Sequence, residues 1–197
     1  TVDSGAHVIH YLALGGSDVS VAVGIKDTGT STGNESVTGL SFQPKAVLVG
    51  SCDVPALDGV GFATFADQSL GVGLSSSNRF TVALASDQQG TSDAAGMLDA
   101  TKVWSFLAPV NTVFAAADFV AHTSDGFTYN ITTAPAVALR LGYVALGGTA
   151  QFAAGTFAQP GSTGNQAVTG VGFTPSVELF LSGGKAANNP VTDTARF

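Results

Sequence analysis

The sequence carries one pattern twice, and the two copies lie about 132 residues apart. Tyr11-Leu-Ala-Leu-Gly-Gly16 returns as Tyr143-Val-Ala-Leu-Gly-Gly148, and residues 31–51 return at 162–182 with 11 of 21 positions identical. Solenoid repeats are roughly 20–50 residues long, so a repeat of this length corresponds to a whole domain. The chain is therefore predicted to contain copies of one fold arranged in tandem.

The repeat divides the chain into three parts. Residues 1–16 match the closing strand of a preceding unit, 17–148 make one complete unit, and 149–197 match the first part of a second unit. We therefore expect residues 149–182 to adopt the conformation of residues 18–51. Two settings account for the partial units: a longer tandem array of which this chain is a segment, or neighbouring chains that complete them.

The local hydrophobic pattern within a unit is that of β-strands. Large apolar residues alternate with small or polar ones in three stretches, 19–24, 80–85 and 127–132. A period of two with β-branched and aromatic residues is typical of half-buried strands. Asp125-Gly126 predicts a hairpin turn, because type I′ turns need positive φ. Helix signals are poor, and residues 92–100 are predicted to form a loop or a single helical turn.

These patterns predict an all-β fold of eight to ten short strands in each unit. The expected architecture is an antiparallel β-sandwich, jelly-roll-like, repeated in units of about 132 residues. The predicted core between its two sheets consists of large apolar and aromatic residues: Phe42, Val47, Val49, Phe80, Val82, Trp104 or Phe106, Phe119, Phe127 and Tyr143.

Composition narrows the classes of function. Only 11% of the residues are charged, against about 25% in typical domains. The net charge of −7 argues against nucleic acid and against an anionic membrane surface. No run of about 18 apolar residues is present that would span a bilayer. Cys52 is the one cysteine, which excludes an intrachain disulfide and a multi-cysteine zinc site.

The residues available for catalysis or metal binding are few. His7 and His10 would point to opposite faces of a strand, so they are not expected to bind one metal together. The two glutamates, Glu35 and Glu178, are not retained between the repeats, which disfavours a catalytic carboxylate pair. We therefore expect no enzyme activity, no metal and no cofactor.

The Ser-Thr-Gly-Asn element is the most distinctive feature that both copies share. It occupies Ser31, Thr32, Gly33 and Asn34, and again Ser162, Thr163, Gly164 and Asn165. One interpretation is a turn that keeps its shape ahead of a strand, because Gly and Asn tolerate positive φ and the hydroxyls bond to nearby backbone. The other is a contact loop for a sugar or for a partner subunit.

These motifs resemble a recurrent module of tailed-phage and prophage virion proteins. The resemblance lies in Thr32-Gly-Asn-Glu35 to Lys45 and in its second copy, Thr163-Gly-Asn-Gln166 to Ser176, where Ser replaces the expected Lys. The Asp125-Gly-Phe-Thr128 and Tyr143-Val-Ala-Leu-Gly-Gly148 stretches resemble the closing strands of that module. The resemblance implies a structural or attachment role and supplies no catalytic residues.

The sequence thus predicts a structural module of an extracellular particle, most plausibly a tailed-phage virion. Its expected partners are neighbouring copies, which would make it a homo-oligomer, or other virion proteins. The alternative is a carbohydrate-binding adhesin or receptor-binding module that contacts surface glycans. That alternative requires an exposed aromatic platform, whereas Trp104, the one tryptophan, lies in an apolar stretch that predicts a core position.

Overall fold

A computed structural model describes residues 13, 15–51, 65–87, 94–108 and 112–182. The described residues form ten strands and no helix. The strands are β1 (Val19–Asp27), β2 (Gly33–Val37), β3 (Pro44–Ser51), β4 (Phe65–Ser75), β5 (Asn78–Asp87), β6 (Ala94–Asp99), β7 (Trp104–Ala108), β8 (Thr112–Thr123), β9 (Gly126–Thr133) and β10 (Arg140–Gly148).

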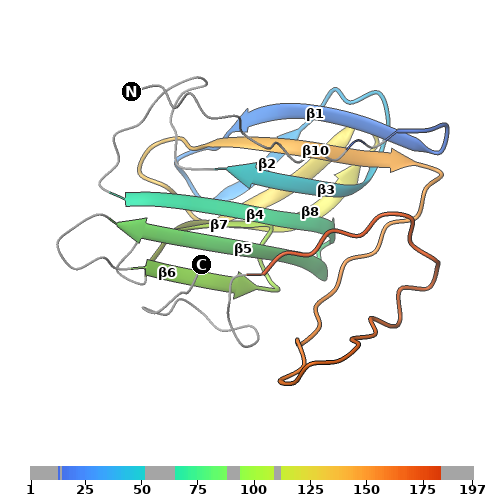
Figure 1. The fold of residues 1–197 in the computed structure, drawn as a ribbon. Helices are drawn as coiled ribbons and strands as arrows, with labels where there is room; N and C mark the ends of the chain where they lie inside the picture. The colour runs from blue at the N-terminus through green and yellow to red at the C-terminus, as the bar shows by residue number, and fades with distance from the viewer. Residues whose placement is uncertain (1–12, 14, 52–64, 88–93, 109–111, 183–197) are drawn as a thin grey trace, which may run out of the picture.

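The strands form two antiparallel sheets that stack face to face (Figure 1). The larger sheet has the order β1-β10-β3-β4-β5-β6, and the smaller has the order β2-β9-β8-β7. The first and last strands pair with each other, as do the second and the ninth, so both ends of the unit meet in the two sheets. The predicted all-β class and the antiparallel two-sheet sandwich are confirmed.

The core lies between the inner faces of the two sheets. Most of the predicted core residues are buried there: Val47, Val49, Trp104, Phe106, Phe119 and Phe127. Phe42 and Tyr143 are partly buried and pack against the same cluster. Burying one large apolar side chain contributes roughly 1.5–3 kcal/mol, so this cluster is the main stabilising feature of the sandwich.

The prediction that Phe80 and Val82 face the core is wrong. Both are only partly buried, and they lie on the outer face of β5, opposite Val72 and Leu70 of β4. The inner face of β5 instead carries small residues such as Ala83, because large side chains of β7 fill the space across from it. Alternation identified the strand, but it could not tell which of two apolar faces is covered.

The prediction of a loop or helical turn at residues 92–100 is also wrong. Residues Ala94–Asp99 form β6, an edge strand that pairs with β5. Ala95 and Met97 point inward and are buried, which gives the segment a weak period of two. Because the inward residues of β6 include small ones, the alternation of apolar and polar residues is too weak to distinguish this strand from a loop by sequence.

The predicted hairpin at Asp125-Gly126 is confirmed, although its physical reason differs. β8 ends at Thr123 and β9 begins at Gly126. A Cβ at Gly126 would overlap the backbone carbonyl of Val37, so glycine is needed there for the close approach of β2. Asp125 reinforces the contact by accepting hydrogen bonds from the N–H groups of residues 39 and 40.

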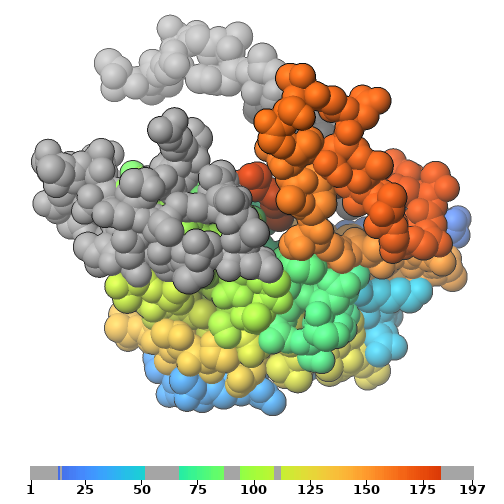
Figure 2. Space-filling view, turned by 90° about the horizontal axis from the view of Figure 1, so that it is seen from below, coloured from blue at the N-terminus to red at the C-terminus, as the bar shows by residue number. Residues whose placement is uncertain are grey.

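Residues 149–182, which form the orange-to-red surface in Figure 2, carry no strand, unlike their sequence counterparts 18–51 (Figure 1). In the sandwich, β1 and β3 both pair with β10, β2 pairs with β9, and β3 also pairs with β4, so β1, β2 and β3 do not pair with one another. The described residues after Gly148 match these three strands in sequence but form none of them. The expectation that residues 149–182 adopt the conformation of residues 18–51 is therefore wrong.

The local backbone of the two copies nevertheless agrees at the retained glycines. Gly39 has φ of 85° and its counterpart Gly170 has 84°. Gly33 and Gly164 have φ of 135° and 155°. The backbone therefore agrees at these two glycines, although residues 33–37 form a strand and residues 164–168 do not.

Candidate interaction site

The two Ser-Thr-Gly-Asn turns occupy different surroundings. Residues 31–34 are exposed, and Gly33 and Asn34 are the first two residues of β2, at the edge of the smaller sheet. Residues 162–165 are also exposed and lie in the segment that carries no strand. The eight side chains are thus accessible in both copies, and only the first copy is anchored to a sheet.

The first turn is held in place by Glu35, the residue that follows it. The backbone N–H of Gly29 donates a hydrogen bond of 2.6 Å to Glu35 Oε1, which closes the loop between β1 and β2. Tyr129 Oη donates to Glu35 Oε2 over 2.8 Å, and Lys26 Nζ lies 3.5 Å from the same oxygen. This arrangement supports the interpretation of the element as a turn whose shape is fixed.

Burial and the neighbouring carboxylate together raise the pKa of Tyr129 far above its usual range. The phenol therefore stays protonated at any physiological pH and acts as a permanent donor to Glu35. The network joins β1, β2 and β9, so it fastens the edges of both sheets at one end of the sandwich.

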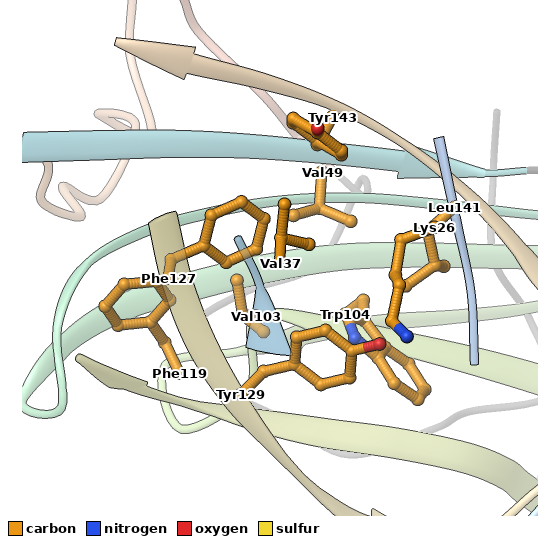
Figure 3. Close-up of a pocket in the computed structure, with 10 residues that line it drawn as sticks. All are labelled: Lys26, Val37, Val49, Val103, Trp104, Phe119, Phe127, Tyr129, Leu141 and Tyr143. Atoms are coloured by element: carbon orange, nitrogen blue, oxygen red, sulfur yellow. The ribbon is translucent and has the colours of Figure 1, made fainter. Parts of the chain in front are cut away.

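The network borders a narrow pocket inside the sandwich (Figure 3). Lys26 and Tyr129 lie among its lining residues, and Trp104 packs edge-on against the Tyr129 ring at 6.0 Å. The remaining lining is apolar: Val37, Val49, Val103, Phe119, Phe127, Leu141 and Tyr143. This lining belongs to the hydrophobic core, so the pocket is a packing feature of the sandwich rather than a substrate cleft.

The second copy replaces three of the four members of this network, Lys26, Gly29 and Glu35, together. At an offset of 131 residues, Phe157 stands for Lys26, Pro160 for Gly29, and Gln166 for Glu35. The cation, the donating N–H and the carboxylate are therefore all lost at once. Loss of one member alone would leave charged or polar groups poorly paired, whereas joint loss leaves a neutral set. Aligning the two copies reveals this joint replacement, but the network itself was not predicted from the sequence.

The most exposed apolar surface of the sandwich lies on β1. Val21, Val23 and Ile25 point away from the core and are 41%, 73% and 53% exposed. β1 is the end strand of the larger sheet and pairs only with β10 among the described strands. It therefore offers both an apolar stripe and an unpaired backbone edge, the two features that promote pairing with another chain.

Ion pairs near this edge hold the strands rather than form a reactive site. Arg140 of β10 makes two hydrogen bonds of 2.6 and 2.7 Å to the carboxylate of Asp27 on β1. The guanidinium lowers the pKa of Asp27.

Burial lowers the pKa of His122, whose ring lies 4.7 Å from that of Phe119.

Within the described ranges, no three His, Cys, Asp or Glu residues are grouped as metal ligands would be. His7, His10 and Cys52 lie outside the described residues. The part of the chain that the structure describes contains no helix of the length and hydrophobicity that crossing a membrane requires. Comparison with protein families, curated proteins and solved structures gave no match to this chain.

Proposed function

We propose that this chain is a structural and assembly module of an extracellular particle, most plausibly the virion of a tailed phage. In this proposal, jelly-roll-like sandwiches of about 132 residues follow one another in tandem and contact neighbouring copies or other virion proteins. The observation that carries the proposal is the exposed apolar stripe of Val21, Val23 and Ile25 on the open edge strand β1. Such a surface favours contact with another protein.

The low charge supports the same function. Only 11% of the residues of the whole chain are charged. Surfaces of this kind lose little solvation free energy when they are buried, because they carry few ions to desolvate. The motif resemblance to virion modules points in the same direction.

The alternative, a glycan-binding module, receives less support. Trp104 is completely buried, so it provides no exposed aromatic platform for a sugar ring. The exposed groups available to contact a sugar include the hydroxyls and amides of the two Ser-Thr-Gly-Asn turns and the rings of Phe157 and Phe180, which contact each other edge-on. A glycan array with the 197-residue chain tests this alternative, and saturable binding abolished by Asn34→Ala would favour it.

Particle labelling tests the proposed function. Antibodies raised against the chain should label purified phage particles from the source culture at one regular position in electron micrographs. A Val23→Lys variant should fold with a stability within about 0.5 kcal/mol of the parent, because the side chain is exposed, but should enter particles less well. Label confined to the particle-free fraction would overturn the proposal.

A further inference from the structure

β1 is the longest of the four strands that end the two sheets (Figure 1). It has nine residues, whereas β2, β6 and β7 have five or six. Its pairing with β10 runs without a register shift, and the strand contains no proline. Proteins commonly protect an edge strand from pairing with other chains by shortness, by a bulge or by proline. β1 has none of these three protections.

The backbone groups on the open side of β1 belong to its odd-numbered residues. At one end the N–H of Thr28 donates to the carbonyl of Leu139, and at the other the carbonyl of Asp18 accepts from the N–H of Ala150. Even-numbered residues therefore direct their N–H and C=O groups toward the β10 side. Because this direction alternates along a strand, the odd-numbered residues direct theirs to the open edge, where no described strand pairs with them.

The exposed apolar stripe of β1 lies on these same odd-numbered residues. Residues 19–25 contain no Asp, Glu, Lys or Arg. The ions that follow them are paired within the chain, Lys26 with Glu35 and Asp27 with Arg140. A strand that pairs along residues 19–25 therefore leaves no isolated ion without water, which would be costly.

The sequence of β1 is complementary to itself when two copies run antiparallel with Ala22 opposite Ala22. In this register Val19 of one copy lies opposite Ile25 of the other. Val21 likewise lies opposite Val23, so each large apolar residue of one stripe meets another from the second stripe. Apolar pairs that lie directly across two strands stabilise a sheet.

The charges at the two ends of the strand match in the same register. Asp18 lies opposite Lys26, and the two-fold symmetry repeats this pair at the other end. Asp18 is exposed and the Lys26 side chain is partly exposed, so both are accessible to a partner. A register shifted by two residues, with Val23 opposite Val23, places Val19 against Asp27 and loses the direct charge pair. The residues thus select a second copy and one register.

We propose that β1 pairs antiparallel with β1 of a second copy, about a two-fold axis between the two Ala22 residues. The larger sheets of both copies then form one continuous sheet. Each copy uses the same strand, so the contact closes as a dimer and does not extend into a filament. This inference rests on the proposed assembly function and names the partner of the open edge as the same chain.

The first test is molar mass by light scattering across protein concentration at low salt. The parent chain should form dimers, and Asp18→Lys should weaken dimerisation by about tenfold, because two attractive pairs with Lys26 become repulsive. Glu178→Lys is the matched control, since it makes the same change of charge at an exposed residue outside β1 and should leave dimerisation unchanged. A parent chain that stays monomeric, or equal weakening by both variants, would overturn the inference.

The second test reads the register by disulfide crosslinking in a Cys52→Ser background. The two Ala22 residues would form a non-hydrogen-bonded pair, whose Cα atoms lie roughly 4.5 Å apart, within the range of a disulfide. Ala22→Cys should therefore give a disulfide-linked dimer under mild oxidation. Ser20→Cys lies on the same face but opposite Gly24, so it should crosslink several-fold less. Equal crosslinking of the two variants, with folding verified by near-ultraviolet circular dichroism of Trp104, would contradict the register.

Particle labelling tests the proposed function separately from this pairing. Labelled particles together with a chain that is monomeric in solution would overturn the pairing of β1 and leave the proposed function standing. A chain that dimerises through β1 but is absent from particles would overturn the proposed function and leave the pairing standing.

Discussion

The coupled network of Lys26 and Glu35 allows a quantitative test of the relation between the two repeats. Glu35→Gln keeps the side-chain volume and an oxygen that can accept from Gly29, but it removes the charge facing Lys26. Hydrogen bonds to charged groups contribute about 1.5–3 kcal/mol, and partly exposed ion pairs about 0.2–1 kcal/mol. Because Lys26 is partly exposed, we expect a loss of about 1–2 kcal/mol.

The second copy carries Phe157 and Gln166 at these two positions. In a Lys26→Phe background the cation is gone, so Glu35→Gln should cost less than it does in the parent. The double variant should therefore lose about 1 kcal/mol less free energy of unfolding than the losses of the two single variants add up to. This difference is within the usual range for residues in contact.

Urea unfolding of the four proteins, followed by the fluorescence of buried Trp104, gives the free energies of unfolding. The parallel pair Asp27→Asn with Lys45→Ala, whose residues the structure does not bring together, controls for general additivity. If the Lys26 and Glu35 effects add to within about 0.5 kcal/mol, the joint replacement in the second copy is not a compensation and the reasoning fails.

Two other changes test separate parts of the account. Gly73→Ala should destabilise the sandwich by about 1–3 kcal/mol in urea unfolding, because its Cβ would overlap the buried ring of Phe119; unchanged stability would contradict the packing. Arg140 lowers the pKa of Asp27, so their pair stabilises the fold above the ordinary carboxyl pKa and is lost as pH falls through the lower folded value. Asp27→Asn should flatten the stability profile below the ordinary carboxyl pKa of about 4, and an unchanged profile would refute the linkage.

Much of the fold could be predicted from the sequence, because alternation and turn residues are local signals. The hairpin before Gly126 and the burial of Trp104 followed from them. The orientation of β5 did not, because Phe80 and Val82 alternate with residues that are also small and apolar. Which face is covered depends on β7, which lies far along the chain.

The site was less predictable for the same reason. The Ser-Thr-Gly-Asn element was found by repetition, and its exposure agrees with a turn. Its anchoring by Glu35 depends on Tyr129, which is 94 residues away and reaches it only through the pairing of β2 with β9. The absence of strands in 149–182 was also missed, because this segment has the sequence pattern of residues 18–51, whose strands pair with β10, β9 and β4.

Amide hydrogen exchange tests the central claim, the two-sheet sandwich, most directly. The topology predicts the strongest protection for the amides of β10, which pairs with β1 on one side and with β3 on the other, and exchange at least about tenfold faster in residues 150–158 and 175–182, which form no strand. Protection of residues 150–158 and 175–182 equal to that of β10 would contradict this account.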